Sequence, residues 1–278
     1  MIWPNNGTTA FAFGFDLDGD TIWQNKIRKY PGWENFLKGP SVGSYGPRKG
    51  AYRILEIMEE FNFKTTWFVP TDIVEEYPDL IRDVVANGHE LAHHGWDHRE
   101  DYGHTFREQK AYLERCQKLF EDIAGVHPVT YRPCGTLLPE TEEWLYSAGG
   151  GICVSTDVIG DRTEYYTING KKTRAVTVPG RVELDDYILT VFNSFPAVLT
   201  GMPRISPYRQ TLSSFISEVE GAVRFENSVC TCSHPQISGS PGRALILREF
   251  CQYLASNPRV WVAPCKDIAE HYRSVVEG

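Results

Sequence analysis

Short segments with strand-like alternation of apolar and polar positions take turns along the chain with longer segments of helical periodicity. The strand-like segments are 10–18, 64–70, 90–95, 130–135, 152–158, 187–193, 228–234 and 259–264. Helical segments lie between most of them, at 51–61, 78–88, 105–125, 211–225, 244–257 and 266–278. In segment 10–18, Phe11, Phe13 and Phe15 share one face of the predicted strand, with small residues between them.

Seven or eight strand–helix units in one chain predict an α/β barrel of parallel strands, formed as a single domain over residues 1–278. The main irregular stretch is 19–50, which is rich in Gly, Pro and aromatic residues. A stretch of this length is typical of a lid or a binding loop. A surface excursion, or a contact between the subunits of a homo-oligomer, explains it equally well.

Composition and charge narrow the function. The net charge of −8 and the isoelectric point of about 5.5 argue against nucleic acid as a partner, which requires a basic surface. A run of about eighteen apolar residues occurs nowhere, so no membrane span is expected. The N-terminus lacks the basic and apolar regions of a secretion signal. The seven cysteines follow no disulfide pattern and predict reduced thiols in a cytoplasmic protein.

Polar side chains with useful chemistry follow four of the predicted strands. They are the acids of DLDGD (16–20), the pair His94 and His98, Arg132, and His234. Catalytic groups of a parallel barrel gather at the carboxyl-terminal ends of its strands. The four strand ends are therefore expected to deliver these side chains to one rim.

The histidines and the acids together indicate a metal site. Five of the eight histidines lie between His89 and His104, and His94 and His98 are four residues apart, which lets both reach one ion. Two histidines and a carboxylate suit a divalent transition metal with open positions for water and substrate. The DLD motif supplies two carboxylates, one to bind the metal and one to act as a base.

Other readings of these motifs explain less. HxxxH occurs in solvated polar stretches, and without HExxH it does not indicate a zinc peptidase helix. An EF-hand counted from Asp16 would need Gly at its sixth position, where Thr21 stands, and an acid at its twelfth, where Ile27 stands. A DxD nucleotide-sugar site leaves the histidines unexplained, and a helix N-cap accounts for one acid but not three.

With these residues assembled, the sequence resembles the polysaccharide deacetylase (NodB-homology) family, from about residue 11 to 265. The strongest local matches are FDLD, GSYGPRKGAYRILEIMEEFNFKTTWFVP and NGHELAHHGWDH. The order of acid pair, HxxxH, Arg-Pro strand and late His is that of the family. The DLD form resembles a single-domain subgroup that includes intracellular peptidoglycan-deacetylase homologues, cofactor-free allantoinases and cyclic imide hydrolases.

The resemblance implies a fold, a cofactor and residue roles. The fold is a distorted (β/α)7-type barrel, and the cofactor is one divalent metal ion, usually Zn²⁺. Asp16 becomes the general base, Arg132 pairs with that base and orients it, and His234 protonates the leaving amine. The implied metal ligands are Asp18, His94 and His98. The residue types alone do not separate zinc from cobalt, nickel or manganese.

The chain also departs from the family pattern. The family's RxPxG stretch is one residue shorter here, at Arg132-Pro133-Cys134-Gly135. In the family this stretch offers a backbone N–H to the oxyanion, and the resemblance assigns that role to Cys134. The later acidic motif is blurred, and either Asp157 or Asp161 could tune His234. Asp185 and Asp186 lie in a segment, 178–187, that resembles a substrate-side segment of the subgroup, or they cap a helix.

Several side chains are candidates for substrate binding. Trp23 and Tyr45, with Tyr30 and Trp33 nearby in sequence, could stack on a sugar ring or gate a small pocket. Cys134 and Asp161 complete the predicted substrate-binding set.

Three functions are weighed. The first is metal-dependent N-deacetylation of an acetylated sugar or a peptidoglycan-type glycan, which the DLD pair favours. The second is hydrolysis of a small cyclic amide of the allantoin or imide type, which the absent signal and the WPNNG stretch favour. Both are hydrolyses of a C–N bond other than a peptide bond. The third is a catalytically silent carbohydrate-binding module, which would predict the loss of Asp16 or His234, yet both are present.

Overall fold

The computed structural model describes residues 3–30, 32, 38–98, 102–148, 153–156, 160–190 and 206–278. Its strands are β1 (Thr9–Ala12), β2 (Gly14–Asp16), β3 (Thr66–Val69), β4 (Glu90–His93), β5 (Thr130–Tyr131), β6 (Cys153–Thr156), β7 (Glu164–Ile168), β8 (Lys171–Asp185), β9 (Ser228–Cys232) and β10 (Val260–Val262). They form one sheet in the order β10-β1-β9-β8-β6-β5-β4-β3-β2, with β7 paired to β8.

The sheet curls into a barrel of parallel strands. The pairings between these strands are parallel, except that β7 and β8 are antiparallel. β1 and β2 follow each other directly in the chain but pair at opposite ends of the strand order. A parallel bridge between Phe15 of β2 and Ser233, just after β9, joins those two ends. The predicted distorted α/β barrel is thereby confirmed.

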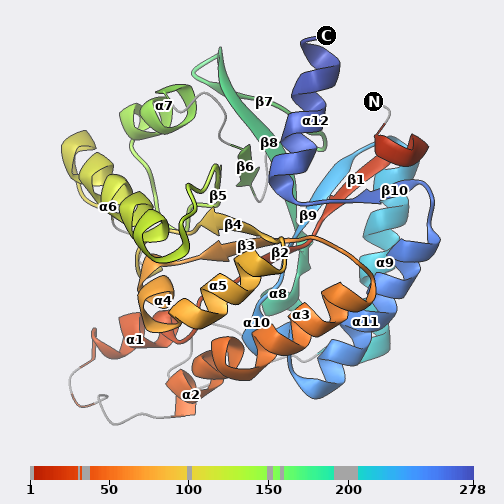
Figure 1. The fold of residues 1–278 in the computed structure, drawn as a ribbon, viewed down its shortest axis with the longest axis horizontal. Coiled ribbons are helices and arrows are strands. Elements are labelled where there is room, and N and C mark those ends of the chain that lie inside the picture. Colours follow the sequence, from red (N-terminus) through yellow and green to blue (C-terminus); the bar gives the residue numbers. More distant parts are fainter. Residues whose placement is uncertain are drawn as a thin grey trace.

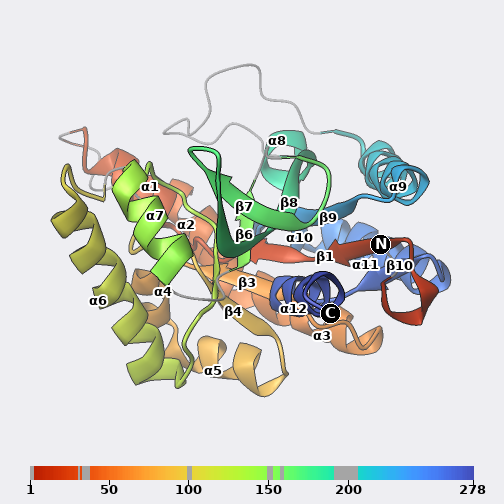
Figure 2. The same ribbon diagram turned by 90° about the horizontal axis from the view of Figure 1, so that it is seen from above.

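Helices cover the outside of the barrel (Figure 1). They are α1 (Thr21–Ile27), α2 (Lys38–Tyr45), α3 (Ala51–Glu60), α4 (Thr71–Glu76), α5 (Pro78–Ala86), α6 (Phe106–Ala124), α7 (Pro139–Ala148), α8 (Asp186–Thr190), α9 (Tyr208–Phe225), α10 (Pro235–Ser238), α11 (Pro241–Ser256) and α12 (Cys265–Val276), with the shorter turns η1 (Pro4–Asn6) and η2 (Gly46–Gly50). Figures 1 and 2 place α6 on one side of the strands and α9 with α11 on the opposite side. None of the helices in the described residues is long and apolar enough to cross a membrane.

Alternation along β1 and β2 divides the apolar residues between two cores. Phe11, Phe13 and Phe15 are buried in the outer core, which also holds residues of α3, α9 and α11. Ala10 and Ala12 belong instead to a second cluster with residues of β3, β4, β8, β9 and α12. Strands that are not neighbours in the sheet meet there, so the small residues of β1 face the inside of the barrel. The predicted common face of the three phenylalanines is confirmed.

The strand predicted at 187–193 is wrong over residues 187–190, and residues 191–193 lie outside the described part of the chain. Residues 186–190 form helix α8, and the strand β8 ends just before it, at Asp185. β8 forms a hairpin with β7 through Asn169 and Gly170, both of which have positive φ values, 50° and 76°. An Asn-Gly pair in this conformation is a strong hairpin signal, and it gives the physical reason why the chain enters the sheet earlier than the apolar pattern predicted.

The stretch 19–50 is largely helical rather than irregular. α1, α2 and η2 lie in it, while residues 31 and 33–37 fall outside the described part of the chain. The packing of η2 against α10 is close, because a Cβ added at Gly50 would lie 2.0 Å from the carbonyl oxygen of Pro235. Glycine at position 50 therefore lets η2 approach the turn that carries His234.

Candidate active site

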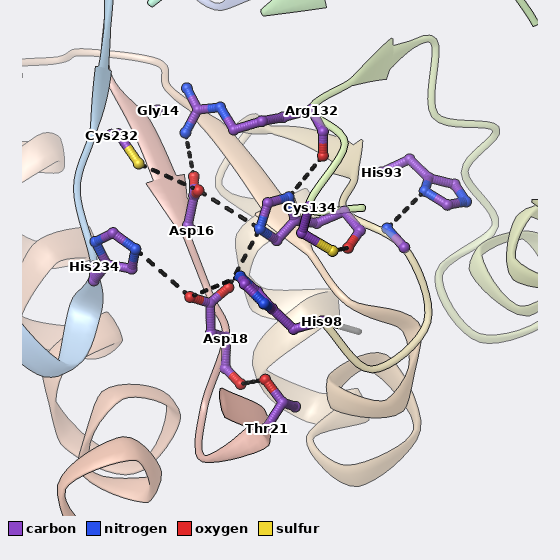
Figure 3. A network of polar contacts seen from close by, with 12 residues as sticks. Gly14, Asp16, Asp18, Thr21, His93, His98, Arg132, Cys134, Cys232 and His234 are labelled. Carbon is purple, nitrogen blue, oxygen red and sulfur yellow. Dashed lines mark hydrogen bonds and ion pairs between the residues drawn. The ribbon is translucent and has the colours of Figure 1, made fainter. Parts of the chain in front are cut away.

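Polar side chains from separate strands meet at the carboxyl-terminal end of the barrel (Figure 3). Asp16 is the last residue of β2, and Asp18 follows two residues later. The other contributors are His94 directly after β4, Arg132 directly after β5, and His234 two residues after β9. Because these strands run parallel, their ends share one rim, as the sequence predicted.

Asp18, His94 and His98 form a cluster. His94 Nε2 lies 3.5 Å from Asp18 Oδ1, and His98 Nε2 lies 3.7 Å from Asp18 Oδ2. Asp18 is fully buried and His94 is 3% exposed. Neither carboxylate oxygen of Asp18 makes a hydrogen bond, and neither does His94 Nε2. Buried polar atoms are costly without partners, and a divalent cation satisfies all three, so the residues fit a metal ion.

The protonation of His94 also suits a metal ligand. Its Nδ1 lies 2.7 Å from the carbonyl oxygen of Arg132, so Nδ1 carries the proton and donates, leaving the lone pair on Nε2. Burial lowers the pKa of His94, although the charges of Asp16 and Asp18 oppose that effect. The neutral form, which is the form that binds metal, is therefore favoured.

Asp16 is held by a buried ion pair. Its Oδ1 pairs with Nη1 of Arg132, and both side chains are 4% exposed. Nη2 of Arg132 donates to the carbonyl oxygen of Thr231 at 2.9 Å, and the guanidinium lies 4.0 Å above the ring of Phe68. Burial alone would raise the pKa of Asp16, but Arg132, His94 and His234 outweigh it and the pKa is lowered. The carboxylate therefore stays ionised and able to accept a proton.

His234 is paired with a carboxylate that the sequence did not single out for that role. Its Nδ1 lies 2.8 Å from Oδ1 of Asp186, whose oxygens also accept from the His234 N–H and from the Ser238 hydroxyl. Burial would lower the pKa of His234, but the hydrogen bond and charge of Asp186, with Asp18 and Asp16, raise it to about 10. These contacts favour the protonated ring, whose Nε2 lies 3.6 Å from Asp18 Oδ2.

The predicted partner of His234 needs correction. Asp161 forms an ion pair with Arg181 and its side chain is 60% exposed, so it does not contact His234. Asp157, the alternative, lies outside the described residues. Asp185 caps the start of α8, since its Oδ1 accepts from the N–H of Tyr187 at 2.7 Å. β8 ends at Asp185 and pairs there with Cys232 of β9, which places Asp186 next to His234. The sequence pattern did not predict this strand end, so Asp186 was not recognised as the partner of His234.

The predicted aromatic residues differ in burial and in contacts. Trp23 is 2% exposed and packs under Gly39. Tyr45 is half-buried and its hydroxyl accepts from Arg53 at 2.8 Å. Tyr30 is 49% exposed, while Trp33 lies outside the described residues. None of these facts assigns a substrate contact.

Cys134 lies beside the two histidines of the metal cluster. Its N–H donates to the Tyr102 hydroxyl at 3.2 Å, so the amide that the resemblance directs at an oxyanion is engaged elsewhere. Its Sγ lies 2.9 Å from the same hydroxyl and donates to the carbonyl oxygen of His94 at 3.2 Å.

Comparisons with known proteins agree with this geometry. A family model described as polysaccharide deacetylase matches residues 44–148. A peptidoglycan deacetylase of Helicobacter pylori is 26% identical over 291 residues, which cover 94% of this chain and 95% of that protein. A crystal structure from Mycobacterium smegmatis, provisionally assigned as a polysaccharide deacetylase, is 31% identical, with a TM-score of 0.88 over 99% of this chain and 94% of its own.

The crystal structure of an allantoinase shares the fold. It superposes with a TM-score of 0.81 over 98% of this chain and 92% of its own, at 19% sequence identity. At this identity the likeness concerns the architecture alone.

Proposed function

Because this chain belongs to the polysaccharide deacetylase family, we propose that it removes the N-acetyl group from an acetylated amino sugar of a glycan such as peptidoglycan, with one divalent metal ion. The observation that carries the proposal is the set of buried atoms without hydrogen bonds, the two oxygens of Asp18 and Nε2 of His94, beside an ionised Asp16 and a protonated His234. A relative named as a peptidoglycan deacetylase, similar along 94% of the chain, supports the substrate class.

The metal would be held by Asp18, His94 and His98. A divalent ion at this position supplies Lewis-acid polarisation of an amide carbonyl and makes water a better nucleophile at neutral pH. Asp18 Oδ1 lies 3.5 Å from His94 Nε2, and Asp18 Oδ2 lies 3.7 Å from His98 Nε2. The three candidate ligands are therefore close together in the protein without substrate.

Asp16 would take the proton from the attacking water. Arg132 occupies its Oδ1, and the Cys232 thiol donates to its Oδ2 at 3.4 Å. The ion pair fixes the carboxylate, while Oδ2 is also 3.6 Å from His94 Nε2 and so faces the metal cluster. A base held in this way loses little conformational freedom when it reacts.

His234 would protonate the leaving nitrogen. An amide anion is a very poor leaving group, so a proton must reach the nitrogen as the C–N bond breaks. Asp186 holds the ring through Nδ1, which leaves Nε2 as the donating atom on the side of Asp18. The base and the acid thus stand on separate side chains, each with its own fixed partner.

The test uses the purified, zinc-loaded protein and a panel of acetylated chitin oligomers, muropeptides and cyclic amides, with the products read by mass spectrometry. Loss of an acetyl group, abolished in Asp16→Asn, is expected. Addition of one water to a ring would replace the proposal with a small-molecule amidohydrolase. A metal-loaded protein that changes no member of the panel would contradict the proposed substrate class.

A further inference from the structure

A thiol lies beside the histidines of the predicted metal site. The Sγ of Cys134 and one ring nitrogen each of His94 and His98 all lie within 4.8 Å of one another. Figure 3 shows Cys134 and His98 on one side of the Asp16–Asp18 pair, and Cys232 and His234 on the other. The metal cluster therefore has a sulfur on the same side as both histidine ligands.

The metal cluster next to Cys134 contains buried atoms that lack hydrogen bonds. His94 Nε2 and both Asp18 oxygens are buried without such a bond, which points to a cation rather than to a thiol packed against a closed core. Sulfur, imidazole nitrogen and carboxylate oxygen are together the donor types that zinc accepts in four-coordinate sites. The set implied by the resemblance, one carboxylate and two histidines, leaves a position that a fourth donor can take.

We propose that Cys134 is an additional, thiolate ligand of the metal ion, so that this chain binds its metal through Asp18, His94, His98 and Cys134. This inference rests on the metal site of the proposed function and changes its composition. On binding, the S–H bond of Cys134 breaks, a sulfur–metal bond forms and the proton passes to the buffer. Zinc tolerates a fifth ligand during catalysis, so water and substrate still have a position.

Burial, with the charges of Asp18 and Asp16, raises the pKa of the Cys134 thiol to about 12, so its proton leaves only as a cation binds the sulfur. The hydroxyl of Tyr102 lies 2.9 Å from Sγ and can donate to it once the thiol proton has left. The contact of the thiol with the carbonyl oxygen of His94, at 3.2 Å, would then be given up. The Cys134 side chain is half-buried, on the loop that follows β5.

If Cys134 is a ligand, its sulfur determines which metal ions the site binds most tightly. Thiolates favour Zn²⁺, Co²⁺ and Cd²⁺ over Mn²⁺ and Mg²⁺. We therefore expect Cys134→Ser to weaken Cd²⁺ binding by about tenfold or more, while Mn²⁺ binding changes much less. Equal losses for the two ions would contradict a sulfur ligand.

The decisive experiment is a titration of the metal-stripped protein with Co²⁺, followed by absorption spectroscopy. Visible d–d bands at one equivalent report the ion in the site, and a thiolate-to-cobalt charge-transfer band in the near ultraviolet reports the sulfur. Both are expected in the wild type. Absence of all cobalt bands would contradict the metal site and with it the proposed function, whereas d–d bands without charge transfer would overturn only the role of Cys134.

Two variants identify the thiol. Cys134→Ser is expected to keep the d–d bands and lose the charge-transfer band. Cys232→Ser is the matched spectral control, because this second thiol, 3.4 Å from Asp16 Oδ2, stands on the opposite side of the acid pair. A charge-transfer band that survives in Cys134→Ser and disappears in Cys232→Ser would overturn the assignment.

A measurement on the wild type keeps the proposal testable if Cys134→Ser does not fold. X-ray absorption of the zinc-loaded protein is expected to show one sulfur at about 2.3 Å among nitrogen and oxygen ligands. A first shell of nitrogen and oxygen alone would overturn it.

Discussion

A buried carboxylate at each end of the barrel allows a comparison, because one accepts hydrogen bonds and the other does not. Glu90 lies at the start of β4, at the amino-terminal end, and is 4% exposed. Its oxygens accept from the hydroxyls of Thr66 and Thr130 and from the N–H of Lys266 in α12. Asp18 lies at the carboxyl-terminal end, fully buried, and neither of its side-chain oxygens accepts a hydrogen bond.

The contacts of Glu90 explain a structural role. Lys266 and Cys265 begin α12, and the N–H of Cys265 donates to the Thr66 hydroxyl at 2.9 Å. The first turn of α12 is thereby fastened across the amino-terminal end of the barrel, where a helix favours a nearby negative charge. Burial raises the pKa of Glu90, and the bonds from Thr130, Thr66 and Lys266 oppose that effect.

This difference in hydrogen bonding distinguishes a carboxylate that stabilises the fold from one that is available to bind a ligand. A protein rarely leaves a buried acid without hydrogen bonds, because the cost is comparable to a sizeable part of its total stability. The same barrel gives the oxygens of Glu90 three hydrogen bonds and those of Asp18 none, which is the contrast that the proposed metal ion would explain. Five changes test this contrast, from the largest expected effect to the smallest.

Asp18→Ala removes the acid at the carboxyl-terminal end. We expect loss of bound metal and of activity to background, because His94 and His98 alone are a weak site. A wild-type protein in metal at a hundred times its dissociation constant gains about 2.7 kcal/mol of stability, and this gain should vanish in the variant. Metal analysis and thermal unfolding with and without Zn²⁺ measure both; a variant with one equivalent of tightly bound zinc would contradict the assignment.

Asp16→Asn alters the neighbouring acid without removing a predicted metal ligand. Its turnover is expected to fall by about a hundredfold or more, the usual contribution of a general base, while the metal content stays at one equivalent. Comparison of kcat with bound zinc separates this change from Asp18→Ala. Full activity in Asp16→Asn would show that the base is another group.

Asp186→Asn breaks the partnership of His234. The amide cannot stabilise the positive charge on the ring, so kcat should fall by about tenfold to a hundredfold with the metal retained. Asp161→Asn is the matched control, because that acid is exposed and pairs with Arg181. Equal losses in the two variants would mean that the Asp186 contact is not what sets the state of His234.

Asp186 also shows where sequence reasoning reached its limit. The cluster of candidate ligands and base was predictable, because Asp16, Asp18 and His94 lie at or within two residues of a strand end and the spacing of His94 and His98 suits one ion. Asp186 was passed over, because the apolar run 187–193 was taken for a strand and the acids before it for a cap or a substrate-side segment. The chain turns into the sheet earlier, at Asn169 and Gly170, so that β8 ends at Asp185 and places Asp186 at the rim.

The stretch 19–50 illustrates a different limit. Its glycines, prolines and aromatic residues indicated a loop, yet α1, α2 and η2 form there. Glycine is a poor helix former on its own, but contact decides the outcome here, since a Cβ at Gly43 would lie 2.3 Å from the carbonyl oxygen of Gly19. The helix propensity of each residue could not predict this outcome, because Gly19 and Gly43 come into contact only when the chain folds.

Glu90→Ala tests the amino-terminal end of the barrel. The hydroxyls of Thr66 and Thr130 and the N–H of Lys266 would lose their acceptor in a buried site, at a cost of about 3 kcal/mol. Glu90→Gln retains one acceptor oxygen and should lose less. Denaturant unfolding measures both, and metal content is expected to stay unchanged. A variant that loses zinc but no stability would reverse the contrast with Asp18.

His89→Asn gives the smallest effect and concerns the residue just before Glu90. Burial, with the charge of Lys64, lowers the pKa of His89 to about 4, and its Nδ1 accepts from the Thr65 N–H at 3.2 Å. The folded pKa lies below the ordinary value of 6.5, so the stabilisation from neutral His89 is complete above pH 6.5 and is lost as the pH falls through 4. Asparagine keeps an acceptor near that position but does not titrate.

The free energy of unfolding of His89→Asn should therefore match that of the wild type near pH 7 within about 1 kcal/mol. It should then fall less steeply between pH 6.5 and 4, where one extra proton on the unfolded wild type contributes at most about 1.4 kcal/mol per pH unit. Guanidinium unfolding at several pH values in this window measures the slopes. Parallel slopes would mean that folding does not lower the pKa of His89, so that the amino-terminal end of the barrel accepts a charged histidine as readily as water does.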